Sequence, residues 1–168
     1  MAPYDNLKIK RYSASLTHDY FISSNAFLRT SIYGYTTSRN WLRQDFSRSA
    51  NTTNKTGIVF GDSTVPNGAV YMKNSTGNRD RQFEVFGIEP RLNYSYYLGE
   101  IANEFDGGIR FHFEKAYEQR INGKKASAHS GDLVDDEERI GYAGSAFLQN
   151  RVFLNDRISI TPGFRLEY

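Results

Sequence analysis

Three segments of the sequence alternate apolar and polar side chains at every second residue, and this pattern constrains the fold most. They are residues 84–96, 104–117 and 158–168. The apolar set of the first is Phe86, Ile88, Pro90, Leu92, Tyr94 and Tyr96. Successive side chains of a β-strand point to opposite faces, so the period of two predicts strands with one apolar and one polar face. No window keeps apolar residues at helical spacing, and we therefore expect no helix.

Weaker alternation in three further segments raises the expected number of strands to about six. These segments are residues 6–18, 25–41 and 140–154. Two prolines fall within expected strands, at Pro90 and Pro162. Proline removes a backbone donor from the sheet, which predicts a bulge or a strand edge at each of these positions.

The connections between the expected strands alternate in length. Long loops are expected at residues 42–81 and 118–138, and the short connections lie at 20–24, 99–103 and 155–156. Loops beyond about 15 residues are uncommon in compact soluble domains. Transmembrane β-barrels, by contrast, combine short periplasmic turns with long extracellular loops. The sequence therefore predicts an all-β, antiparallel transmembrane β-barrel segment.

Aromatic residues are abundant for so polar a chain, at 15% of all residues where the whole hydrophobic fraction is 39%. Phe105 and Tyr117 are separated by about 30 Å along the membrane normal, given about 3.3 Å per residue and a tilt of roughly 40°. We expect Tyr94, Tyr96, Tyr97 and Phe105 in the periplasmic aromatic girdle and Tyr117 in the outer one, because amphipathic rings favour the interface.

Composition excludes several other classes of protein. The chain has no cysteine, so it holds neither a disulfide framework nor a thiolate metal site. It contains no run of about 18 apolar residues that would form a transmembrane helix. A net charge of +2 gives no reason to expect nucleic acid as a partner. His18, His112 and His129 lie far apart without a zinc-binding pattern, and His112 is expected to make a hydrogen bond on the polar face.

Catalysis is not expected either. No nucleophile, base and orienting group can be assembled from the sequence, so we expect neither enzymatic activity nor a cofactor.

Three motifs in order resemble TonB-dependent outer-membrane receptors, in particular those of the ferric citrate type. They are residues 83–92 (FEVFGIEPRL), 144–151 (GSAFLQNR) and 160–168 (ITPGFRLEY). The last is similar to a strand that recurs in the barrel of that family, and the "AFLQ" strand precedes it there as well. The resemblance extends from about residue 6 to residue 168.

The resemblance implies an active transporter with a plug inside a barrel of about 22 strands. Residues 1–168 would then be a partial barrel domain without the plug, because only about six strands are recognised. The implied partners are the lipid of the bacterial outer membrane, an anionic ferric chelate as the transported ligand, and the TonB complex. That complex would act through an N-terminal region that lies in the parent receptor and is not recognised in this chain.

A ferric carboxylate complex is anionic, which makes arginines the expected ligand-binding residues. The loop at 42–81 carries six basic and three acidic residues, for a net charge of +3, whereas residues 118–138 carry −3. The expected binding residues are Arg39, Arg43, Arg79, Arg81, Arg91 and Arg110. The alternative interpretation is that such arginines pair with Glu89, Asp106 or Glu114 and hold the barrel wall together; Arg91 would face Glu104 or Asp106 across a hairpin.

The acidic run Asp132, Asp135, Asp136, Glu137 and Glu138 lacks the spacing of a calcium-binding loop. We therefore interpret it as a solvated loop and expect no metal site.

Two other architectures remain open on the sequence. A small complete barrel of about eight strands, acting as an adhesin, would need an additional hairpin from residues 57–61 and 70–73. A soluble β-sandwich that binds carbohydrate would use Trp41 and loop tyrosines as stacking platforms.

Overall fold

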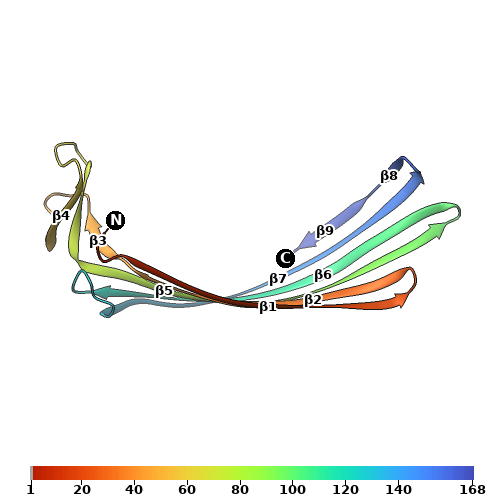
Figure 1. Cartoon of the computed structure of the whole chain (residues 1–168), viewed down its shortest axis with the longest axis horizontal. Coiled ribbons are helices and arrows are strands. Elements are labelled where there is room, and N and C mark those ends of the chain that lie inside the picture. Colours follow the sequence, from red (N-terminus) through yellow and green to blue (C-terminus); the bar gives the residue numbers. More distant parts are fainter. Residues whose placement is uncertain (1) are drawn as a thin grey trace. The chain divides into compact units, whose positions relative to one another are not determined.

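The computed structural model describes residues 2–168, and every helix or strand element in that range is a β-strand. The strands are β1 (Asn6–Ser23), β2 (Ala26–Leu42), β3 (Gln44–Ser47), β4 (Lys55–Gly61), β5 (Ala69–Leu98), β6 (Ile101–Gly123), β7 (Asp132–Asn155), β8 (Ile158–Ile160) and β9 (Gly163–Glu167). They form one sheet in the order β1-β2-β5-β6-β7-β8, in which β3 and β4 pair with β5, and β9 pairs with β7 (Figure 1). Within this part of the chain, no helix is long and apolar enough to cross a membrane.

The six strands expected from alternation are all present. Tight turns at residues 24–25, 99–100 and 156–157 join β1 to β2, β5 to β6 and β7 to β8, and a two-residue turn requires antiparallel neighbours. Pro162 lies in the break between β8 and β9, where the sequence predicts an interruption. Pro90, in contrast, lies within an uninterrupted β5.

The prediction of a long loop at residues 42–81 is wrong, because most of these residues form strands. β4 and the start of β5 form a hairpin in which Val59 faces Tyr71 and Phe60 faces Val70. β3 pairs with β5 as well, with Phe46 opposite Met72. Backbone hydrogen bonds hold these strands together, and residues 74–81 of β5 are polar on both faces. A strand without an apolar face produces no period of two, and this region was therefore predicted as loop.

The second long loop is also shorter than expected. β6 continues to Gly123 and β7 begins at Asp132, so only residues 124–131 connect them. The acidic run that starts at Asp132 consequently lies on a strand and not in a loop. Thr76 and Asn78 each donate a hydrogen bond to the carbonyl of Ala128 and thereby attach this loop to β5.

The chain divides into two compact units. The first contains residues 2–11, Thr37–Phe83 and Ala116–Arg139, and the second contains Tyr12–Thr36, Glu84–Lys115 and Ile140–Tyr168. The three tight turns belong to the second unit, and the β4–β5 hairpin belongs to the first.

Large apolar side chains of the second unit are exposed. Leu16 is 68% exposed, Ile109 61% and Leu148 52%. The buried hydrophobic side chains of residues 2–168 are few and mostly small: Ala26, Ala69, Met72, Val85 and Ala126. The sheet of the second unit therefore leaves large apolar side chains uncovered.

Both alternative architectures conflict with this topology. A β-sandwich needs two sheets, whereas residues 2–168 form one. The hairpin required by the small complete barrel is present between β4 and β5, but the sheet order within these residues contains no pairing of β1 with β8 or β9. Residues 2–168 therefore form neither a small closed barrel nor a two-sheet sandwich.

Candidate functional site

Arg91 and Asp106 form an ion pair across the β5–β6 hairpin in the second unit. Arg91 Nε donates to Asp106 Oδ1 at 2.7 Å, and its Nη2 donates to Oδ2. Gln149 Nε2 of β7 donates to the same Oδ2 at 3.1 Å, so three strands meet on one buried carboxylate. The Arg91 guanidinium also lies 5.6 Å from the centre of the Phe147 ring. The expected pairing of Arg91 with Asp106 is confirmed.

Tyr33 is at the centre of a second network in the same unit. Arg110 donates to the Tyr33 hydroxyl from Nε at 3.0 Å and from Nη2 at 2.6 Å. His112 Nδ1 lies 3.1 Å from that hydroxyl, whose own proton is available to the ring nitrogen. Arg110 Nε is 4.0 Å from Glu89, and His112 Nε2 is 3.9 Å from Glu114. The hydrogen bond expected for His112 on the polar face is thus present.

A glycine on the intervening strand makes this network possible. Tyr33 is on β2 and reaches β6 by lying across Gly87 of β5. A Cβ at Gly87 would come within 2.2 Å of Tyr33 Cζ and 2.4 Å of its hydroxyl oxygen. Only glycine therefore lets the tyrosine ring lie this close to the sheet.

Arg79 and Arg81 of β5 converge on Glu118 of β6 in the first unit. Arg81 Nη2 lies 2.7 Å from Glu118 Oε1, and Arg79 Nη1 lies 3.7 Å from the same oxygen. The hydrogen bond from Arg81 lowers the pKa of the Glu118 carboxyl below its usual value, against the opposing effect of burial. The two arginines thus share one carboxylate, which leaves a net charge of one positive unit on the three side chains.

Arg39 and Arg43 differ from the other four arginines in their partners. Their guanidinium carbons lie 5.5 Å and 5.3 Å from the centre of the Trp41 ring, and Arg43 also lies 5.1 Å from the Phe46 ring. All three residues of the Arg39–Trp41–Arg43 cluster are half-buried. Within residues 2–168 neither side chain pairs with a carboxylate, so the cluster holds two positive charges that only a π-face compensates.

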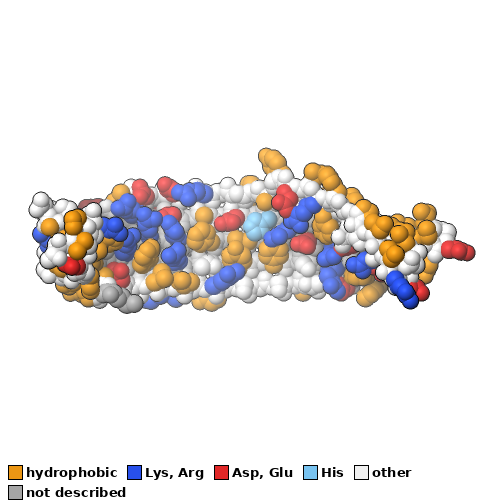
Figure 2. All heavy atoms as spheres, turned by 90° about the horizontal axis from the view of Figure 1, so that it is seen from above, with side chains coloured by type: hydrophobic (Ala, Val, Ile, Leu, Met, Phe, Trp, Pro, Cys, Tyr) orange, Lys and Arg blue, Asp and Glu red, His pale blue; other side chains and the backbone are white. Residues whose placement is uncertain are grey.

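Charges of both signs are interspersed on the face seen in Figure 2, where basic side chains are blue and acidic ones red. The acidic run on β7 is paired in part, since Lys124 Nζ lies 3.4 Å from Asp132 and Gln119 donates to Asp136 at 3.3 Å. Within the described residues, no three His, Asp or Glu side chains lie where they could hold a metal ion.

Comparison with solved structures identifies this fold. The structure matches "Crystal structure of ferric citrate transporter FecA in the unliganded form" with a TM-score of 0.74, over 98% of this chain and at 21% sequence identity. The chain therefore has the fold of part of that transporter chain. It covers 21% of the transporter chain, and so spans about a fifth of its length. No family model and no curated protein matches the sequence.

Among the six arginines expected to bind the ligand, the sequence indicated a partner correctly only for Arg91, which pairs with Asp106. Four of the six interact with carboxylates or with Tyr33, whereas Arg39 and Arg43 flank an indole ring. Tyr33 and Gly87 were missed as a pair, although both lie on alternating strands and Gly87 belongs to the polar face of residues 84–96. The signal available was a glycine at a polar-face position, which marks a close approach by another group.

Proposed function

We propose that this chain forms part of the barrel wall of an outer-membrane receptor that takes up an anionic ferric chelate. The observation that carries the proposal is the Arg39–Trp41–Arg43 cluster, in which two guanidinium groups lack a carboxylate partner. Ferric complexes of carboxylate ligands are negatively charged, and guanidinium groups bind carboxylates through paired hydrogen bonds. Half-burial in the cluster strengthens such a contact relative to one in open water.

The remaining arginines have a different role in this proposal. Arg79 and Arg81 on Glu118, and Arg91 on Asp106, hold neighbouring strands together across the polar face. Arg110 positions Tyr33 in the same way. An incoming anion would have to displace a carboxylate from these groups, which makes them weaker first contacts than Arg39 and Arg43.

The whole receptor, in this proposal, has a barrel of about 22 strands embedded in the bacterial outer membrane. The TonB complex drives release of the chelate through the plug and the N-terminal segment of the whole receptor. The exposed apolar side chains of the second unit contact lipid.

Trp41 is the only tryptophan of the chain and therefore reports directly on the cluster. Ferric complexes absorb in the near ultraviolet and quench indole fluorescence at short range. We expect ferric citrate to quench Trp41 in the detergent-solubilised protein in a saturable way. The double variant Arg39→Gln/Arg43→Gln removes two charge-assisted contacts, so its affinity should fall about tenfold or more.

The matched control is Arg157→Gln, in the tight turn at residues 156–157, which changes charge in the same way outside the cluster. The control variant should retain the affinity of the unaltered protein. Equal affinity of the double variant and the unaltered protein would refute the assignment of the cluster, and the lack of saturable quenching by any ferric carboxylate complex would refute the proposed ligand class.

A further inference from the structure

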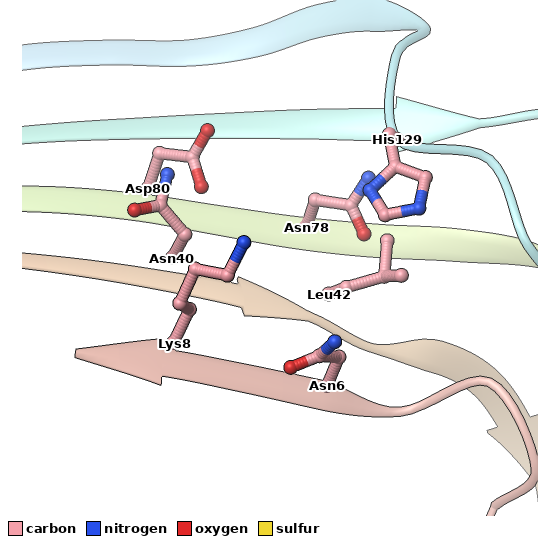
Figure 3. A pocket seen from close by; sticks show the side chains of 7 residues that line it. All are labelled: Asn6, Lys8, Asn40, Leu42, Asn78, Asp80 and His129. Carbon is pink, nitrogen blue, oxygen red and sulfur yellow. The ribbon is translucent and has the colours of Figure 1, made fainter.

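An open pocket of about 230 Å³ lies in the first unit, on the opposite face of β5 from the arginines that bind Glu118. Asn78 and Asp80 line it, and they alternate along β5 with Arg79 and Arg81, so the two pairs point to opposite faces. Figure 3 shows side chains from β1, β2, β5 and the 124–131 loop around this space. The lining residues are Asn6, Lys8, Asn40, Leu42, Asn78, Asp80 and His129.

The geometry of the sheet explains why these residues come together. Three adjacent strands each contribute two residues in an i, i+2 relation, which places each pair on one face of its strand. His129 closes one side, because the hydrogen bond from Asn78 to the Ala128 carbonyl at 2.9 Å holds the loop against β5. The pocket is therefore built on paired strands and an anchored loop.

Most of the polar groups that line the pocket are uncommitted. Within residues 2–168, the side chains of Asn6, Lys8, Asp80 and His129 make no hydrogen bond or ion pair. This distinguishes the pocket from the opposite face of β5, where Arg79 and Arg81 are engaged with a carboxylate. Uncommitted donors and acceptors around one space are what a polar ligand requires.

The mixture of groups selects the chemical class of the ligand. Lys8 and the amides donate hydrogen bonds, and the Asp80 carboxylate and the amide oxygens accept them. The Asp80 carboxylate would repel a ligand with a net negative charge, and the Lys8 ammonium group would repel a cationic one. A neutral ring bearing several hydroxyl groups satisfies both, because each hydroxyl both donates and accepts.

The volume also limits the ligand. Pockets for drug-sized molecules enclose roughly 300–1,000 Å³. At about 230 Å³, this pocket has room for one small ring and not for an extended molecule. We propose that it binds a single neutral sugar unit.

Two sources could supply such a unit: the saccharide part of a glycolipid in the outer leaflet, or a dissolved oligosaccharide. If the arginines on β5 line the lumen, as the proposed function implies, the pocket faces outward, which favours the glycolipid. The chemistry of the pocket itself does not depend on that function.

The test is saturation-transfer NMR on the detergent-solubilised chain with methyl glycosides of glucose, galactose and N-acetylglucosamine. We expect at least one glycoside to receive saturation at its ring protons. The double variant Lys8→Met/Asp80→Asn should lose about tenfold or more in affinity, because two charged hydrogen-bonding groups are removed. Two competitors distinguish the sources: de-acylated lipopolysaccharide oligosaccharide in one arm and a soluble glucan in the other. The competitor that displaces the glycoside more strongly identifies the source.

The matched control is Lys10→Met/Asp135→Asn, which makes the same changes at β1 and β7 positions that do not line the pocket. It should bind the glycosides as the unaltered protein does. Equal binding by the pocket variant, or no saturation of any glycoside, would overturn the proposal. Arg39→Gln/Arg43→Gln should leave the glycoside signal unchanged while weakening chelate quenching, and this separates failure of the sugar site from failure of the chelate site.

Discussion

Gly87 is a position at which the structure leaves no room for a side chain. A methyl group there would approach Tyr33 Cζ to 2.2 Å, whereas ordinary contacts begin near 3.4 Å. In Gly87→Ala the Tyr33 ring must therefore move by about 1 Å or more. Its hydroxyl now lies 2.6 to 3.1 Å from Arg110 and His112, and a shift of that size breaks these hydrogen bonds.

The expected cost is the loss of these hydrogen bonds less a gain in the backbone. Hydrogen bonds to a charged group contribute about 1.5–3 kcal/mol and neutral ones about 1 kcal/mol. Arg110 and His112 keep access to water, so the lower part of that range applies. Replacing glycine by alanine within a strand returns about 0.5–1 kcal/mol. With the two donations from Arg110 counted as one charged contact of about 1.5 kcal/mol and the His112 contact as about 1 kcal/mol, we expect Gly87→Ala to lower the free energy of unfolding by about 1.5–2 kcal/mol.

A double-mutant cycle separates this mechanism from a general effect of the methyl group. In a Tyr33→Ala background the added methyl meets no ring, so Gly87→Ala should become neutral or stabilise the protein by about 0.5–1 kcal/mol. Unfolding would be followed by Trp41 fluorescence during denaturant titration in detergent. Gly144→Ala is the control, because a Cβ there would lie 4.0 Å from its nearest neighbour. An equal cost of Gly87→Ala in both backgrounds would refute the reasoning.

Two further changes test the first unit. The hydrogen bond from Arg81 lowers the pKa of Glu118, so its contribution to stability is complete above the unfolded pKa of about 4.3 and is lost as the pH falls through the lower folded value. Glu118→Gln should therefore flatten the acid limb of stability measured between about pH 6 and pH 2, and an unchanged limb would contradict this. Gly61 adopts a φ of +87°, and a Cβ there would lie 2.2 Å from a backbone oxygen of the hairpin loop. Gly61→Ala should therefore open the β4–β5 hairpin and speed proteolysis at residues 62–68, whereas an unchanged cleavage rate would show that the hairpin tolerates the strain.

The sequence predicted strands well only where one face is apolar. Residues 84–96 and 104–117 lie within β5 and β6, and residues 158–168 form β8 and β9 with a break at residues 161–162; all three segments alternate because their faces meet different surroundings. Residues 69–81 also pair with neighbouring strands, with shifts in register, but residues 73–81 are polar on both faces, so no periodicity marked them. The strands of that region are stabilised by backbone hydrogen bonds, which do not depend on an apolar side-chain pattern.

Side-chain contacts between strands could be predicted only for strands that are joined by a short turn. Arg91 and Asp106 face each other across a two-residue turn, so the strand pattern brings them together. Tyr33 and Arg110 lie on strands separated by β5, and their contact depends on register and on a glycine between them. A single sequence does not encode that register in any local pattern.

The three two-residue turns have a consequence for the way in which the sheet forms. β1 pairs with β2, β5 with β6 and β7 with β8 across these turns, so the three loop closures are short and their entropic cost is small, whereas the pairing of β2 with β5 must close residues 43–68. Such local pairing favours growth by one hairpin at a time, with every added hairpin templated by the edge strand of the last. Each hairpin that joins the sheet thus pairs the backbone groups left open on the edge strand before it.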